Sequence, residues 1–476
     1  MPELLEEVYN YIDEQQDRSI QDLRTFLRQP SISAQELGLV ECADLLGDLM
    51  REAGIDTQVY PVSGAGPIVV GQVRYPEATK TLVCYGHYDV QPPDPVELWT
   101  TDPFAADLRA GRIFARGATD DKGSLFESVK AVQALLETQG RLPVNMVMVF
   151  EGEEEIGSGH FGSWVAEHRD LFEDADGVYG LDGNCDPFTG YPRMYLWGTG
   201  GILYVELRVQ TAEHDTHAGE AAWVPNAAWR LTWALGTLKD ERERILIDGW
   251  YEDYVQAPQE EIEFFEQLPF DENQVKEYCG VEELLLGRSG GEVYRARYYE
   301  PTCTIAGFRS GYGGKGMKTV VPCEATAKID FRLRRNQEPQ KQLELLKAYL
   351  ARQGFGDIEV IPLAARPSAA LPPTYRKADV SVAMQRAAER FFGVRPIIWG
   401  GATEPVEGPS LVERYGLAIL GDTGNGALQA LGIPDARGWM GDLHSNIHAA
   451  DEFISVKAFV RGQKIAATII QEFAGA

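Results

Sequence analysis

Three of the seven histidines in the chain stand beside carboxylates in patterns typical of metal ligands. His87 opens a His-x-Asp triplet, His217 lies in Asp-Thr-His-Ala-Gly, and His448 begins His-x-x-x-Glu. Acidic residues lie between the first two histidines, namely Asp120, Asp121, Glu153, Glu154, Glu155 and Asp182. Nitrogen and oxygen donors so far apart in sequence must be assembled by the fold, and together they indicate a two-metal hydrolase.

Three of these candidates follow short apolar runs that predict buried strands: His87 after 81–86, Glu154 after 144–150, and Asp182 after 177–181. Helical spacing over 122–138 places Asp120 immediately before a helix. Ligands of open α/β sheets bind at the carboxyl ends of the strands. We therefore expect three strand ends to deliver donors to one edge of a sheet.

The elements alternate between strands and helices, which predicts an α/β domain with a mostly parallel central sheet covered on both faces. Further helices are expected at 3–28, 35–53, 376–392 and 454–473, and further strands at 67–71 and 416–420. From about residue 200 the pattern changes to alternating strands at 202–209, 324–333 and 358–361, with helices at 226–240 and 340–353. We expect a discontinuous catalytic domain, 1–199 and 377–476, around an inserted α+β domain, 200–376, that pairs through a strand edge in a dimer.

The composition excludes several classes of protein. A formal net charge of −28 argues against a nucleic-acid partner, because phosphate backbones bind basic surfaces. No apolar stretch is long enough for a transmembrane helix, and the acidic, amphipathic residues 1–7 are unlike a signal peptide. The six cysteines are scattered, without a Cys-x-x-Cys pair, which indicates reduced thiols, no thiolate zinc site and a cytoplasmic location.

Two metal ions about 3.5–4 Å apart need a bridging carboxylate and further ligands on each side. The available donors can be divided as Asp120 on both ions, His87 and Asp182 on one, and Glu155 and His448 on the other. Nitrogen and oxygen donors suit Zn²⁺, with Mn²⁺ or Co²⁺ as alternatives. Glu154 is the candidate general base for a metal-bridging water, and Asp89 would orient His87.

Each pattern alone has a simpler explanation. Residues 119–121 could cap the following helix, 153–155 could be a solvated charge run, and Asp182 could belong to a turn. The glycine-rich stretch 311–319 resembles a phosphate loop but leads into a strand, and Ser158 lacks a Gly-x-Ser-x-Gly frame. Only the joint occurrence of the donors at strand ends favours the metal site.

Longer stretches around these residues resemble the carnosinase-like branch of peptidase family M20, whose members are dinuclear zinc metallopeptidases. The similar blocks follow in order along nearly the whole chain: 81–93, 117–123, 151–158, 215–219, 314–322, 331–336 and 448–452. The resemblance implies a cis peptide bond between Asp120 and Asp121. It also selects His448 over His444 as a ligand, and His217 over His214 as a functional residue.

The same resemblance implies roles for the insert, which would be a lid and dimerisation domain. His217 would reach the active site of the partner subunit in a homodimer and act as an oxyanion donor. Arg332 would hold the free carboxylate of the substrate, with assistance from Thr319. The long insert, and Asp rather than Glu at position 182, are similar to the dipeptidases of the family.

The expected function is hydrolysis of the peptide bond of dipeptides or short peptides. One loop departs from the family pattern, because Glu404 stands in 400–405 where relatives have Gly-Gly-Ser/Thr-Ile-Pro, which alters the polarity where substrate ends are recognised. An N-acyl-amino-acid deacylase or carboxypeptidase of the same family is one alternative. A non-catalytic dimeric binding protein is another.

Overall fold

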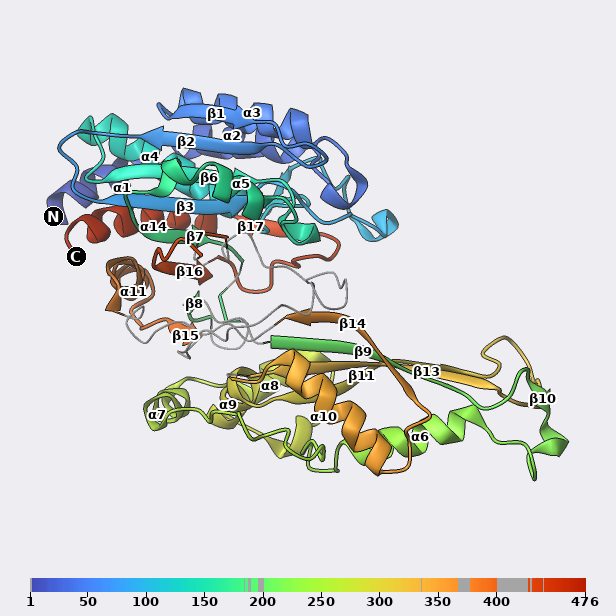
Figure 1. The fold of residues 1–476 in the computed structure, drawn as a ribbon. Helices are drawn as coiled ribbons and strands as arrows, with labels where there is room; N and C mark the ends of the chain where they lie inside the picture. Colours follow the sequence, from blue (N-terminus) through green and yellow to red (C-terminus); the bar gives the residue numbers. More distant parts are fainter. Residues whose placement is uncertain are drawn as a thin grey trace. The chain divides into compact units, whose positions relative to one another are not determined.

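The computed structural model describes residues 2–183, 185–186, 190–195, 201–334, 336–366, 377–399, 427–428, 430–439 and 441–476. Contacts within the chain divide it into two compact units (Figure 1). Unit 1 contains the described residues of 1–197, 373–399 and 421–476, and unit 2 contains those of 198–372. The predicted strand 416–420 and the loop with Glu404 lie outside the described residues.

Unit 1 holds the central sheet and most of the helices. Its helices are α1 (Pro2–Glu14), α2 (Gln16–Arg28), α3 (Leu39–Glu52), α4 (Lys122–Gln139), α5 (Phe161–Glu167), α11 (Asp379–Phe392) and α14 (Val456–Ala474). Its strands are β1 (Asp56–Tyr60), β2 (Ile68–Val73), β3 (Thr81–His87), β4 (Asp107–Arg109), β5 (Arg112–Phe114), β6 (Asn145–Glu151), β7 (Ala175–Leu181), β8 (Arg193–Tyr195), β15 (Ile397–Trp399), β16 (Asp435–Trp439) and β17 (Phe453–Ser455).

The central sheet has the strand order β1-β2-β6-β3-β7-β16-β8-β15. Strands β6, β3, β7 and β16 run parallel to one another, while β1, β2 and β8 each join an antiparallel neighbour. The predicted α/β class with a mostly parallel central sheet is confirmed. The parallel strands lie in the middle, where helices cover both faces, as their almost uninterrupted apolar sequences predict.

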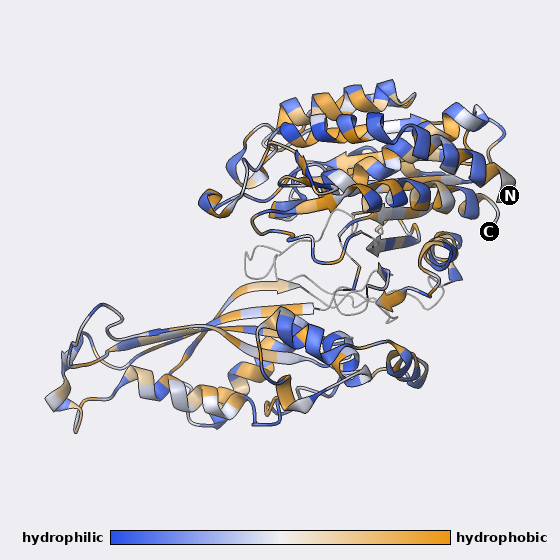
Figure 2. Cartoon of the chain, turned by 180° about the vertical axis from the view of Figure 1, so that it is seen from behind, coloured by the Kyte–Doolittle hydropathy of each residue, from blue (hydrophilic) through white to orange (hydrophobic). Residues whose placement is uncertain are grey.

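Both faces of this sheet are buried. In β3, Leu82 and Cys84 belong to a core cluster with α1–α4, α11 and α14, whereas Val83 and Tyr85 pack in a second cluster with α5. Burial of one such large apolar side chain contributes about 1.5–3 kcal/mol. Figure 2 shows hydrophobic and hydrophilic residues alternating along the helices, as expected for helices with one face on a core.

Unit 2 is an α+β unit, as predicted. Its strands are β9 (Gly201–Gln210), β10 (Thr216–His217), β11 (Thr302–Ser310), β12 (Val320–Val321), β13 (Glu324–Leu333) and β14 (Glu359–Arg366). Its helices are α6 (Ala227–Leu238), α7 (Gln259–Gln267), α8 (Glu272–Cys279), α9 (Gly291–Tyr299) and α10 (Pro339–Arg352). An antiparallel sheet in the order β11-β13-β9-β14 packs one face on α6 and α10, and β10 pairs with β12.

Two predicted helix boundaries are wrong. The expected helix 3–28 is interrupted at Gln15, where φ is −92° and ψ is 8°. The prediction missed this one-residue break because the apolar spacing continues through it. The expected helix 35–53 begins at Leu39, after Gly38 in a left-handed conformation. The helices α7–α9 and the edge strand β11 were not predicted, because the three helices span only about two to three turns and most side chains of β11 are exposed.

No helix in the part of the chain that the structure describes is long and apolar enough to cross a membrane. All six cysteines fall in that part, and none forms a disulfide.

Candidate metal centre

Three neighbouring parallel strands of unit 1 end at the candidate ligands. Strand β3 ends at His87, β6 leads into the short turn of 3-10 helix Glu154–Ile156, and β7 is followed by Asp182. The strands β6, β3 and β7 are hydrogen-bonded side by side and run in the same direction. Their carboxyl ends therefore meet at one edge of the sheet, and donors from distant parts of the sequence gather there.

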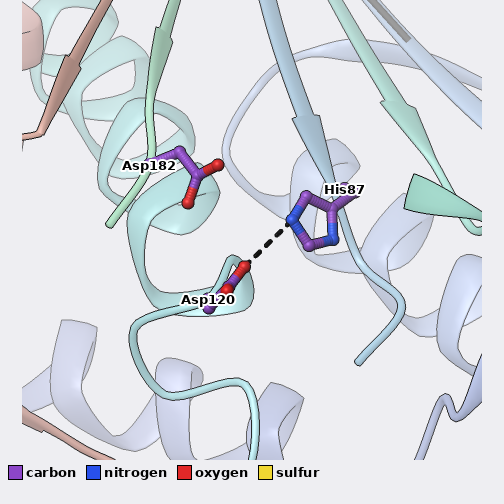
Figure 3. Close-up of side chains that lie close together, drawn as sticks. All are labelled: His87, Asp120 and Asp182. Atoms are coloured by element: carbon purple, nitrogen blue, oxygen red, sulfur yellow. Dashed lines mark ion pairs between the residues drawn. The ribbon is translucent and has the colours of Figure 1, made fainter. Parts of the chain in front are cut away.

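Asp120 lies between two histidines. Its Oδ1 is 3.2 Å from His87 Nε2, and its Oδ2 is 3.0 Å from His448 Nε2. Glu155 Oε2 is 3.3 Å from the same nitrogen of His448. Figure 3 shows His87 and Asp120 facing each other with Asp182 beside them. Asp120 thus belongs to two donor groups, His87–Asp120–Asp182 and Asp120–Glu155–His448, in each of which the donor atoms lie within 4.8 Å of one another.

Asp89 contacts both His87 and the segment that carries the glutamates. The Nδ1 atom of His87 lies 3.1 Å from the backbone oxygen of Asp89 and 3.3 Å from its Oδ1. The carboxylate of Asp89 also accepts hydrogen bonds from the backbone N–H groups of Glu154 and Glu155, each at 3.1 Å. Because these contacts occupy Nδ1, the other ring nitrogen of His87 faces the donor groups.

The pair Asp120–Asp121 is not explained by helix capping. Helix α4 begins at Lys122, and Asp121 makes no side-chain bond to its first turn, so the capping explanation is wrong. The Oδ2 atom of Asp121 instead accepts a hydrogen bond from the backbone N–H of His87 at 3.1 Å, and Thr119 donates to the carbonyl of Phe453. The peptide bond between Asp120 and Asp121 is cis, as the resemblance implies.

Glu452 anchors the loop that carries Asp120, a role that the sequence did not reveal. Its fully buried carboxylate accepts four hydrogen bonds, from Arg116 Nη1 at 2.6 Å and from the backbone N–H groups of Gly117, Thr119 and Asp120 at 3.1, 2.9 and 3.1 Å. The only signal in the sequence was an acidic residue four positions after His448. The same segment therefore supplies one donor and fixes the position of another.

Replacing Glu452 by glutamine is expected to lower the free energy of unfolding by about 3–5 kcal/mol, because it leaves the Arg116 guanidinium buried without its partner. Urea unfolding of the metal-free protein measures this change. Asp451→Asn is the matched control, since Asp451 bonds to Thr100 and Arg109 but keeps 27% of its side chain exposed. Equal losses in the two variants would contradict the anchoring role.

Carboxylates crowd the site. Burial raises the pKa of Glu154 to about 8. Burial, reinforced by the charge of Asp120, raises the pKa of Asp182 to about 7. The hydrogen bond to Asp120 raises the pKa of His448 to about 10. The site therefore favours bound positive charge.

The donor set fits two divalent cations. The buried Nε2 atom of His87 lies 3.2 Å from Asp120 Oδ1 but forms no hydrogen bond of acceptable geometry among the described residues, and the buried Oε1 atom of Glu155 likewise has no hydrogen-bond partner there. Buried polar atoms without partners are uncommon in folded proteins, and these two belong to the two different donor groups. Two divalent cations would balance the four negative charges that the nearby carboxylates carry when ionised, namely those of Asp120, Glu154, Glu155 and Asp182.

The other predicted residues lie in unit 2. His217 is in β10, which pairs with β12, and the neighbouring Ala218 N–H bonds to the carbonyl of Thr319 at 3.3 Å. Arg332 lies near the end of β13, where its Nε and Nη2 contact Asp330, each at 3.0 Å. His217 and Thr319 are therefore neighbours, and Arg332 lies elsewhere in the unit.

Strand β13 separates Arg332 from His217. The strand spans about 26 Å from Glu324 to Arg332 at a rise of about 3.3 Å per residue. Figure 1 shows β10 beyond the end of β13 that is farther from Arg332, at the tip of unit 2. One chain thus does not bring His217 and Arg332 together.

Known proteins resemble this chain over most of its length. The model of Peptidase family M20/M25/M40 matches residues 83–472. The chain is 30% identical to the Cys-Gly metallodipeptidase dug1 of Schizosaccharomyces pombe, over 73% of this chain and 76% of that protein. It is also 30% identical to the Beta-Ala-His dipeptidase of Homo sapiens, over 70% of this chain and 68% of that protein.

A solved structure of the same family also resembles this chain. An M20 family metallo-carboxypeptidase, Sso-CP2 from Sulfolobus solfataricus, has a TM-score of 0.77 and 32% identity, covering 96% of this chain and 99% of its own. The region matched by the family model contains every candidate donor described above, from His87 to His448. The resemblance inferred from the motifs is confirmed: the chain belongs to peptidase family M20/M25/M40.

Proposed function

We propose that this protein is a two-metal peptidase that hydrolyses the peptide bond of dipeptides or short peptides. The observation that carries the proposal is Asp120, whose two oxygens face two different histidines. His87 and Asp182 would hold one ion, Glu155 and His448 the other, and Asp120 both. Nitrogen and oxygen donors suit Zn²⁺, with Mn²⁺ or Co²⁺ as alternatives.

Glu154 is the candidate general base. When bound, two such ions polarise a carbonyl and lower the pKa of a water to about 7. Glu154 belongs to neither donor group, yet its Oε2 lies only 3.8 Å from His87 Nε2. It would take the proton of the attacking water and pass it to the leaving nitrogen. The bond from its backbone N–H to Asp89 would hold it in position.

Arg332 and His217 would contact different groups of the substrate. The contacts of Arg332 with Asp330 fix the plane of its guanidinium, and 49% of the side chain remains exposed to bind the carboxylate of a substrate. His217 would donate a hydrogen bond to the oxyanion, with Thr319 beside it. Unit 2 would in this way serve as a lid.

The separation of these residues supports a homodimer. A dipeptide extends about 7 Å, so His217 and Arg332 of the same chain cannot both contact one substrate. We infer that each active site takes Arg332 from its own chain and His217 from the partner chain. The fitting assembly is a symmetric dimer, in which both sites are completed in the same way.

Unit 2 has a surface suited to such a dimer. Strand β11 lies at an edge of its sheet, and its Ile305 and Phe308 are exposed. The stacked rings of Trp229 and Trp233 on α6 are each 57% exposed. An open strand edge beside exposed aromatic side chains favours association with a second copy of the chain.

Metal removal tests the proposed centre. Dialysis against a chelator is expected to abolish peptidase activity, and Zn²⁺, Mn²⁺ or Co²⁺ is expected to restore it, because the donor groups cannot polarise a carbonyl alone. Activity is measured on free dipeptides, with elemental analysis of the protein before and after dialysis. Full activity in metal-free protein would contradict the proposal.

Substrate length and blocking groups distinguish the members of the family. The named activities of the curated relatives, together with Asp182, favour dipeptides, whereas the similarity to Sso-CP2 favours a carboxypeptidase as the second candidate. A panel of free dipeptides, longer peptides and N-acetyl or N-succinyl amino acids separates the activities. Turnover of only the longer or blocked substrates would rule out a dipeptidase.

We also propose a cytoplasmic enzyme whose partner is its small peptide substrate. Free cysteines are typical of reducing compartments. The net charge of −28 disfavours binding to nucleic acid.

A further inference from the structure

We propose that Gly219 is a positioning residue for His217, because its N–H selects the tautomer of the imidazole and its missing side chain leaves room for the ring. The inference rests on the proposed role of His217 as an oxyanion donor. Gly219 follows His217 by two positions, in the short turn of 3-10 helix Ala218–Glu220. Its backbone N–H donates a hydrogen bond to His217 Nδ1 at 3.0 Å.

This hydrogen bond decides which ring nitrogen can donate. A backbone N–H is only a donor, so Nδ1 of His217 must accept and carries no proton. The proton of the neutral ring is then on Nε2, at the opposite side of the imidazole from Gly219. A hydrogen-bond donor aimed away from the loop is what stabilisation of an oxyanion requires.

Space around the ring gives a second, independent reason for glycine. A Cβ atom at position 219 would lie 2.9 Å from Nδ1 of His217 and 3.3 Å from its Cε1. The backbone of Gly219 does not have a positive φ, so other residues could adopt its conformation. The close approach of the imidazole, rather than backbone freedom, is therefore what excludes a side chain here.

The backbone around His217 is held by the facing segment. His217 pairs with Val320, and Ala218 N–H bonds to the carbonyl of Thr319. The Oδ1 atom of Asp215 accepts a hydrogen bond from Cys323 N–H at 3.0 Å. Because these contacts hold the loop and the ring itself is exposed, an added methyl group would displace the imidazole and leave the fold intact.

The first test is a double-mutant cycle on the metal-loaded protein, with kcat and KM measured for Gly219→Ala, His217→Ala and the combined variant. Gly219→Ala is expected to lower kcat by roughly 10- to 100-fold with unchanged KM and metal content, since a displacement of about 1 Å costs on this order. In the His217→Ala background it should have no further effect. Wild-type kcat in Gly219→Ala, or equal losses in both backgrounds, would overturn the inference.

Gly313→Ala is the matched control. Gly313 also lies in a loop of unit 2 without a positive φ, but a Cβ there would meet no atom within 4 Å. This variant is expected to keep wild-type kcat. A loss equal to that of Gly219→Ala would overturn the specific role of Gly219.

The tautomer is measured without reference to activity. In metal-free protein labelled with ¹⁵N at histidine, long-range proton–nitrogen correlations identify the protonated ring nitrogen, and His217→Ala assigns the signal. We expect protonation at Nε2 in the wild type and a mixture of tautomers in Gly219→Ala. A wild-type ring protonated at Nδ1 would overturn the inference. If His217→Ala kept full activity, the proposed role of His217 would fail, and the spectrum would still decide the role of Gly219.

Discussion

Glu154→Gln is expected to lower kcat by roughly 10²- to 10⁴-fold, the usual contribution of a general base. Glutamine has nearly the shape of glutamate but cannot accept a proton at neutral pH. Because Glu154 belongs to neither donor group, the variant should keep its full complement of metal. Steady-state kinetics on a dipeptide, together with elemental analysis of the purified variant, measures both effects.

The adjacent residue gives the matched control. Glu155 Oε2 contacts His448 Nε2, and its Oε1 is buried without a partner among the described residues, as expected for a metal ligand. Glu155→Gln should therefore lose metal from the purified protein, and its activity should recover in part when excess metal is added. Loss of metal from Glu154→Gln, with retention by Glu155→Gln, would show that the two roles are exchanged.

Mixing two inactive variants is expected to restore activity if His217 acts across the dimer. His217→Ala should lose roughly 10²- to 10³-fold in kcat, as for removal of an oxyanion donor. In a mixed dimer of His217→Ala and Glu154→Gln, one site combines Glu154 with His217 from the partner. Random exchange of subunits at equal amounts should then give about a quarter of wild-type activity.

The control is a second mixture, in which the Glu154→Gln variant is combined with the Glu155→Gln variant. Both changes lie in the candidate metal centre of unit 1, so each site in the mixed dimer would keep one defect and no activity should return. Activity in the first mixture that stays at the average of the two variants after subunit exchange would mean that His217 serves its own chain.

The sequence predicted the elements that surround the candidate metal centre. Strands β3, β6 and β7 are short apolar runs, and polar residues follow each of them, so both their positions and their shared edge were predictable. The insert was harder to predict, because α7–α9 are short helices and most side chains of the edge strand β11 are exposed. At the N-terminus, the regular spacing of apolar residues concealed the break at Gln15.

The candidate donors were predictable for the same local reasons, but the residues that hold them in position were not. Nothing near Glu452 in the sequence indicates that it binds the loop of Asp120, which lies 332 positions away. In the same way, the pattern Asp120–Asp121 suggested a helix cap, whereas Asp121 bonds to the backbone of His87. Such contacts depend on which loops the fold brings together.

By itself the sequence determined the types of donor, their attachment to strand ends and the class of fold, because side-chain chemistry and apolar periodicity are local properties. Only the tertiary structure decided how the two oxygens of Asp120 are directed, what anchors its loop, and how far His217 lies from Arg332. These features are distances and directions between atoms, which chain packing sets and residue spacing alone does not.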